Sequence, residues 1–124
     1  GNVGEEYVTF SEFRLLNAYL CIYSAMFDAF SCINARSDRI DEEEFKKSYS
    51  KVQQYGFVAM SPAGWMAKKP SSIYSELDTD GSGQISYNEW CAYIINAEVK
   101  AGTALGKLMD GYNLLAQLYL LAYI

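Results

Sequence analysis

Apolar side chains recur at intervals of three and four residues along much of the chain, and this spacing predicts α-helices. Residues 11–30, SEFRLLNAYLCIYSAMFDAF, form the first predicted helix. After a polar stretch, DEEEFKKSYSKVQQYG predicts a second helix that opens with acidic residues and ends on Gly56 as its C-cap. We therefore expect an all-α protein whose β segments are two residues long at most.

The second half of the chain continues the helical pattern. Ser61–Pro62 is expected to start a short helix that Pro70 stops. SSIYSELD predicts a short helix before residues 78–89, and NEWCAYIINAEVKA predicts a helix after them that Gly102 ends. The last segment, TALGKLMDGYNLLAQLYLLAYI, predicts a helix that is apolar on nearly every side.

Composition narrows the class of protein. Of the 124 residues, 51% are hydrophobic and 15% aromatic, which is enough to bury a core. The net charge of −5 argues against a nucleic-acid partner and suits cations or basic partners. The chain contains no histidine and shows no nucleophile–base pair, so we do not expect an enzyme. Cys21, Cys32 and Cys91 are expected to be buried, reduced thiols of a cytoplasmic protein.

One stretch, DTDGSGQISYNE at residues 78–89, spaces its oxygen-bearing side chains as a calcium-binding EF-hand loop does. Calcium takes six to eight oxygens at about 2.3 to 2.6 Å, and alternate side chains of a tight loop supply several of them. Gly83 at position 6 lets the chain turn with positive φ, so that the next carbonyl faces inward. The expected ligands are Asp78, Asp80 and Ser82 at positions 1, 3 and 5, the carbonyl of Gln84 at position 7, Ser86 at position 9 through a water, and Glu89 at position 12 with both oxygens.

Three carboxylates and one neutral serine surround this predicted site. Few carboxylates limit both the repulsion within the loop and the attraction for the ion. We expect a dissociation constant of about 10⁻⁷ to 10⁻⁵ M, the range of calcium sensors. Ile85 at position 8 is expected to point into the core and to pair with a second loop through a short β bridge.

The second loop is found at residues 33–44, INARSDRIDEEE, where Ile40 takes position 8 and Glu44 takes position 12. Its ligand positions are not filled, since Ile33 stands where the first aspartate belongs and Asp38 replaces the glycine. A one-residue slip that places Asn34 first gains little. We expect a structural hand without an ion that pairs Ile40 with Ile85, so that the chain binds one Ca²⁺.

A third and weaker match to the EF-hand loop pattern lies in GNVGEEYVTFSEF, where Val8 and Glu12 fall at positions 8 and 12. One interpretation is that the chain is the C-terminal part of a longer protein. The other is a plain helix start capped by Thr9 or Ser11. The expected organisation is therefore residues 1–30 as the remnant of a preceding hand with a long helix, 31–101 as the EF-hand pair, and 102–124 as the apolar C-terminal helix.

With these elements in place, the segments FSEFRLLNAYL, MFDAF, RIDEEEFKKSYSKVQQYGF and ELDTDGSGQISYNEW resemble the calflagins, the flagellar calcium-binding proteins of trypanosomes. The resemblance covers roughly residues 8–101. It implies four EF-hands in two lobes, a calcium-dependent conformational change, and a flagellar membrane setting reached through N-terminal acylation. Membrane association would belong to the full-length protein, because this chain carries no acylation site. The implied calcium ligands are the six named above.

Two hypotheses follow for the function. The first is a calcium-responsive sensor or adaptor, in which an amphipathic helix fills a hydrophobic groove. That helix is either a partner protein's or the chain's own C-terminal helix, which could also pack on another subunit or lie on a membrane surface. The second is a structural, light-chain-like subunit of a flagellar or cytoskeletal assembly that holds its partner with or without calcium.

Overall fold

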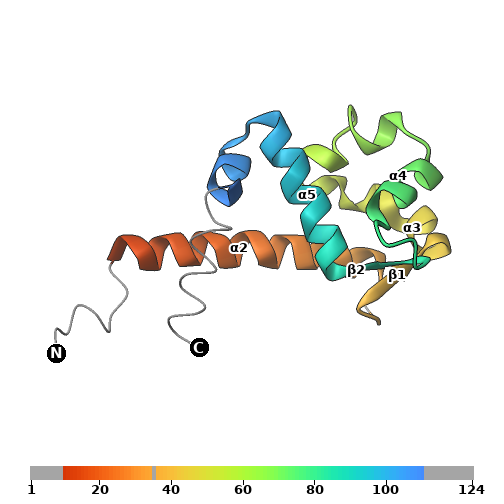
Figure 1. Cartoon of the computed structure of the whole chain (residues 1–124), viewed down its shortest axis with the longest axis horizontal. Helices are drawn as coiled ribbons and strands as arrows, with labels where there is room; N and C mark the ends of the chain where they lie inside the picture. Colours follow the sequence, from red (N-terminus) through yellow and green to blue (C-terminus); the bar gives the residue numbers. More distant parts are fainter. Residues whose placement is uncertain (1–9, 35, 111–124) are drawn as a thin grey trace.

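The computed structural model describes residues 10–34 and 36–110, and these are helical apart from two short strands (Figure 1). The all-α class is confirmed, although each strand has three residues where two were predicted at most. The sequence interpretations of residues 1–9 and 111–124 lie outside the described residues. The elements are α2 (Phe10–Ile33), β1 (Arg39–Asp41), α3 (Glu42–Ser48), the 3₁₀ helices η1 (Tyr49–Tyr55), η2 (Val58–Met60) and η3 (Trp65–Ala67), α4 (Pro70–Leu77), β2 (Gln84–Ser86), α5 (Tyr87–Ala101) and a helical segment at 104–110.

Helix α2 confirms the first predicted helix and packs against α5 and η1. Its N-terminal half extends beyond the body of the molecule in Figure 1. Large apolar side chains on α2 are exposed at Phe13, Leu20 and Phe27, with fractions of 55%, 63% and 55%. Judged by length and hydropathy alone, α2 is the one helix among the described residues that is long and apolar enough to cross a membrane, with a mean hydropathy of 1.3. Because Met26, Ala29 and the other buried residues of α2 lie in the core, the same composition also fits a core helix.

The second predicted helix is two elements rather than one. Helix α3 begins with a capping box in which Asp41 and Glu44 each accept the other's backbone N–H. The chain then tightens into η1, and Gly56 ends it with the predicted left-handed conformation, at φ 74°. Tyr49, Val52 and Tyr55 are spaced by three, so the three residues per turn of a 3₁₀ helix place all of them toward the core.

The linker between α3 and α4 differs from the prediction. No α-helix starts at Ser61–Pro62; this region contains the short turns η2 and η3 instead. Pro70 does not stop a helix but occupies the first turn of α4, where its missing N–H costs nothing. The linker contributes Trp65 to the core, with its ring edge-to-face against Phe45 at 5.3 Å and Trp90 at 5.6 Å. Trp65 is therefore a core residue.

The C-terminal end of α5 is fixed by a buried glutamate. Glu98 is 3% exposed; its carboxylate accepts the backbone N–H of Val58 at 2.6 Å and the hydroxyl of Thr103 at 2.8 Å. Thr103 in turn caps the segment 104–110 by accepting the N–H of Gly106 at 3.0 Å. A side chain at Gly106 would collide with the carbonyl of Glu98, because its Cβ would lie 2.2 Å from that oxygen. One carboxylate therefore joins η2, α5 and the segment that follows.

We predict that Glu98→Ala lowers the free energy of unfolding by about 2 to 3 kcal/mol, since two hydrogen-bond donors lose their acceptor in the interior. Thermal and urea denaturation followed by circular dichroism measure this change. Glu98→Gln should cost less, because its amide oxygen still accepts one bond. The exposed Glu43→Ala is the control, and a Glu98→Ala variant as stable as this control would contradict the assigned role.

Candidate metal centre

The loop at residues 78–89 joins α4 to α5 and gathers three carboxylates. Oxygens of Asp78, Asp80 and Glu89 all lie within 4.8 Å of one another. An ion at about 2.3 to 2.6 Å from each ligand can bridge two oxygens up to roughly 5.2 Å apart, so each pair of these oxygens is close enough to share a calcium ion. Among the described residues, this is the one group of three or more acidic, histidine or cysteine side chains with that property. The donor set, oxygen atoms only, fits calcium.

The backbone of the loop is turned toward these carboxylates. Gly83 has the predicted positive φ, 82°, and its N–H donates to Asp78 at 2.8 Å. Gly81 also has a positive φ, 66°, which sequence reasoning did not anticipate. The N–H of Ser82 lies 3.1 Å from an oxygen of Asp78 and 3.0 Å from one of Asp80. These backbone bonds hold the two aspartates inside the turn.

The neutral ligands predicted from the sequence divide into two groups. The hydroxyl of Ser82 lies 3.3 Å from Asp78 and donates to the carbonyl of Gln84 at 2.9 Å, so both are next to the carboxylates. Ser86 instead caps α5, where its hydroxyl accepts the N–H of Glu89 at 3.2 Å. The structure therefore brings Ser82 and the Gln84 carbonyl beside the aspartates, whereas the hydrogen bond of Ser86 is made to the helix.

Hydrogen bonds favour the ionised form of two of the carboxylates. The pKa of Asp80 lies below its ordinary value because the backbone and hydroxyl of Ser82 bond to it. Burial opposes ionisation of Glu89, yet its pKa is also lowered, because the N–H groups of Ser86 and Asp80 and the hydroxyl of Thr79 donate to it. Both groups are therefore negatively charged at neutral pH.

The two loops are joined by the short antiparallel ladder of β1 and β2. Ile40 faces Ile85 in the register, and both side chains are fully buried. The predicted pairing of these isoleucines is confirmed. Because side chains alternate along a strand, this register places the neighbours Arg39, Asp41, Gln84 and Ser86 away from the core.

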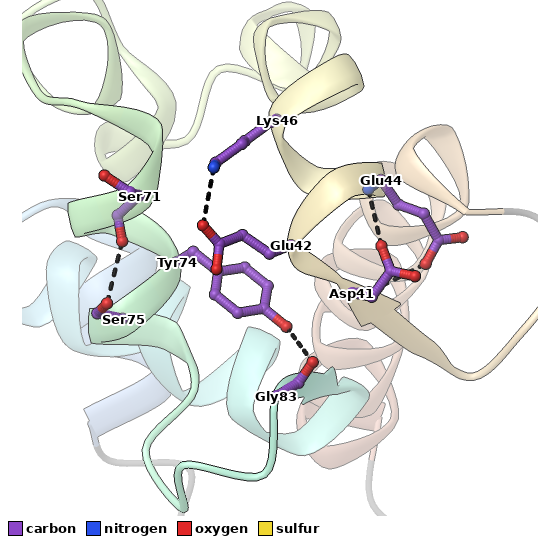
Figure 2. Close-up of polar contacts among 8 residues, drawn as sticks. All are labelled: Asp41, Glu42, Glu44, Lys46, Ser71, Tyr74, Ser75 and Gly83. Carbon is purple, nitrogen blue, oxygen red and sulfur yellow. Dashed lines mark hydrogen bonds and ion pairs between the residues drawn. The ribbon is translucent and has the colours of Figure 1, made fainter.

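Tyr74 is a residue of this region that sequence reasoning missed. From α4, its hydroxyl lies 2.6 Å from the carbonyl of Gly83 (Figure 2). It also lies 3.2 Å from the carbonyl of Ile40 in the other loop. Burial, with the negative charges of Asp78 and Asp41 beside it, raises the pKa of Tyr74 to about 12. The hydroxyl therefore keeps its proton at physiological pH and ties both loops to one helix.

The exposure of the cysteines differs from the prediction. All three are free thiols, but only Cys91 is buried, where burial raises its pKa to about 11. Cys32 is partly exposed, and Cys21 is exposed because it lies on the outward face of the extended half of α2. The prediction of three buried thiols was wrong for Cys21, because the described core does not cover that side of α2, and for Cys32, which is only partly buried where its thiol lies 3.2 Å from the hydroxyl of Tyr55.

The chain is similar in sequence to two proteins whose names refer to calcium binding. The chain is 30% identical over 90 residues to a flagellar calcium-binding protein of Trypanosoma cruzi, a match that covers 72% of this chain and 39% of that protein. It is 27% identical over 100 residues to flagellar calcium-binding protein TB-24 of Trypanosoma brucei brucei, covering 79% and 42%. The chain resembles the trypanosome flagellar calcium-binding proteins. It spans about two fifths of the length of these relatives. No protein-family model and no solved structure matches the chain.

We predict that Tyr74→Phe lowers the melting temperature by about 4 to 8 °C, the shift that a loss of about 1 kcal/mol produces in a small domain. The reason is that the Gly83 carbonyl loses the hydroxyl that lies 2.6 Å from it, and the Ile40 carbonyl loses a longer polar contact at 3.2 Å. Tyr93→Phe is the matched control, since it removes a tyrosine hydroxyl that bonds Glu76 outside the loops. Equal melting temperatures for the two variants, measured by circular dichroism, would contradict the role given to Tyr74.

Proposed function

We propose that this chain is a calcium-binding EF-hand unit that responds to calcium and binds a protein partner. The observation that carries the proposal is the convergence of Asp78, Asp80 and Glu89 within 4.8 Å, in a loop whose glycines have the required positive φ. The names of the two trypanosome relatives support calcium as the ion and the flagellum as the location. The proposed ligands are these three carboxylates with Ser82, the Gln84 carbonyl and Ser86, and the proposal includes no catalysis and no nucleic acid.

A response to calcium would pass from Glu89 into α5. Glu89 lies in the first turn of that helix and also reaches back across the loop to Thr79 and Asp80. The next residue, Trp90, is fully buried and donates its indole N–H to the carbonyl of Met26 on α2 at 2.9 Å. When bound, the ion would supply a positive charge that fixes Glu89 against the aspartates, and α5 and α2 would follow through Trp90.

The partner surface that we propose is the groove between α2 and α5. Tyr23 of α2 and Tyr87, Cys91 and Ile95 of α5 contribute to a groove with a volume of about 490 Å³. The groove starts one turn from Glu89, so a shift of α5 would change its width. A helix of a partner protein fits such a groove through its apolar side. The apolar sequence of residues 111–124 is a second candidate occupant, within the same chain or between copies of it.

Calorimetric titration tests the calcium site. We predict one calcium per chain with a dissociation constant of about 10⁻⁷ to 10⁻⁵ M. Glu89→Gln should abolish binding, because it removes the charge and one carboxylate oxygen at position 12. Glu44→Gln changes the same position of the other loop and should leave the stoichiometry at one. Two ions per chain, or full calcium binding by Glu89→Gln, would contradict the assignment of a single calcium site at residues 78–89.

A second candidate function is a structural, light-chain-like subunit of a flagellar or cytoskeletal assembly. The exposed apolar side chains of α2 favour it. Phe13, Leu20 and Phe27 recur every seven residues and therefore share one side of the helix, which is suited to a neighbouring helix whether or not calcium is bound. In this case calcium would have a secondary role.

Tryptophan fluorescence distinguishes the two candidates. Trp65 and Trp90 are both buried and in ring contact, and Trp90 directly follows Glu89. For a calcium-responsive protein, we predict a reversible change in tryptophan emission on adding calcium and then a chelator, with excitation selective for tryptophan because the chain also has 11 tyrosines. The change should persist when Trp65→Phe leaves Trp90 as the only tryptophan. Unchanged emission in a chain that binds calcium by calorimetry would favour the structural subunit.

A further inference from the structure

The loop at residues 33–44 is held closed by a side chain that the EF-hand pattern does not require. Asn34 follows the last residue of α2, and its amide nitrogen donates to the carbonyl of Arg39 at 3.1 Å and to a carboxylate oxygen of Glu44. The amide oxygen accepts the N–H of Arg36 at 3.0 Å. Because two oxygens surround one end of the amide and an N–H the other, the orientation of the group is fixed.

The two acceptors are the significant part of this arrangement. In the alignment with the EF-hand pattern, Arg39 is at position 7 and Glu44 at position 12. An intact loop directs the carbonyl of position 7 and the carboxylate of position 12 at the ion. The NH₂ group of Asn34 therefore connects the same two oxygens that a calcium ion would connect. Its two polar hydrogens satisfy them without an ion.

In the loop at residues 78–89, the residue at position 2 also bonds the carboxylate at position 12, but it does not bond the carbonyl at position 7. Thr79 occupies position 2 there, as Asn34 does in the other loop, and its hydroxyl donates to Glu89 at 3.0 Å. A hydroxyl has a single hydrogen, so Thr79 cannot also bond the position 7 carbonyl, which accepts from Ser82 instead. In the loop at 78–89 the position 7 carbonyl and the position 12 carboxylate therefore have separate donors, whereas in the loop at 33–44 one amide joins them.

Further bonds extend the closure to β1 and α3. The other oxygen of Glu44 accepts the N–H of Asp41 at 2.9 Å, and Asp41 accepts the N–H of Glu44 (Figure 2). Asn34 thus holds the carboxylate whose second oxygen fixes the end of β1, the strand that pairs with β2. The loop at residues 33–44 therefore contacts the loop at residues 78–89 through the pairing of Ile40 with Ile85.

We propose that the Asn34 amide is a built-in substitute for the calcium ion of this loop: it keeps calcium out and holds β1 in position for β2 at every calcium concentration. The inference deepens the proposed function and rests on it for the effect on calcium affinity. A loop that depended on an ion would leave β1 unanchored at low calcium. With the amide in place, the calcium loop has a formed partner strand before the ion arrives.

Two variants of the full chain test this proposal. Asn34→Asp has the same shape but replaces the donor by a second carboxylate facing Glu44, so the like charges repel. Asn34→Ala removes the donor without adding charge. Ser37→Ala is the control, because the Ser37 hydroxyl accepts the N–H of Arg39 in the same loop but does not bond Glu44. Each protein is melted in a calcium chelator and in calcium, and titrated with calcium by calorimetry.

In the chelator, we expect both Asn34 variants to melt about 4 to 8 °C lower than the wild type, and Ser37→Ala within about 2 °C of it. Calcium should raise the melting temperature of Asn34→Asp by more than it raises that of the wild type, because a cation can bridge the two carboxylates. Affinity at residues 78–89 should fall about fivefold in Asn34→Ala.

The proposal is overturned if both Asn34 variants melt with Ser37→Ala in the chelator, or if Asn34→Asp gains no more from calcium than the wild type does. Failure of the proposed function has a different signature. A wild-type chain that binds no calcium would remove the calcium site. The melting comparison in the chelator contains no calcium and would still decide whether the amide closes the loop.

Discussion

The antiparallel pairing of Ile40 with Ile85 determines where everything else in the lobe can lie. A ladder of three residue pairs is too short to be stable alone in water, so it depends on the core beneath it. Both isoleucines are fully buried in that core, and the hydroxyl of Tyr74 touches the backbone of both loops from below. Separating the strands would expose both side chains and move the Gly83 and Ile40 carbonyls away from that hydroxyl, so the ladder, the core and Tyr74 together hold the two loops side by side.

Aromatic rings extend this unit to the rest of the protein. Phe45 after β1, Trp65 in the linker, Trp90 after β2 and Phe30 on α2 form a continuous series of contacts with ring centres 5.3 to 5.7 Å apart. Each ring comes from a different element. The linker is therefore not a passive connection, because Trp65 fills the space between the helices that follow the two loops.

The parts of the structure that the sequence predicts are those governed by short spacing. The turn at Gly83, the cap at Gly102 and the register of Ile40 with Ile85 follow from positions counted within one loop or one helix. Tyr74 and Glu98 could not be found this way, since their partners are up to 40 residues away. The 3₁₀ form of η1 carried a local signal, the spacing by three of Tyr49, Val52 and Tyr55, which also fits the α-helix that was expected. Asn34 was considered as a ligand, but its role as a donor depends on where Glu44 lies in three dimensions.

The length of α2 has a mechanical consequence. A helix of 24 residues is about 36 Å long, and its buried residues are Tyr19 and, in its C-terminal half, Met26, Ala29, Phe30 and Ile33. A rigid rod that pivots at one end moves its other end in proportion to its length, so a tilt of about 10° at Phe30 would displace Phe10, about 30 Å away, by roughly 5 Å. Small adjustments near Trp90 and Met26 would therefore be amplified at the far end, where the helix carries exposed phenylalanines. The geometry gives α2 a long arm that ends well away from the two paired loops.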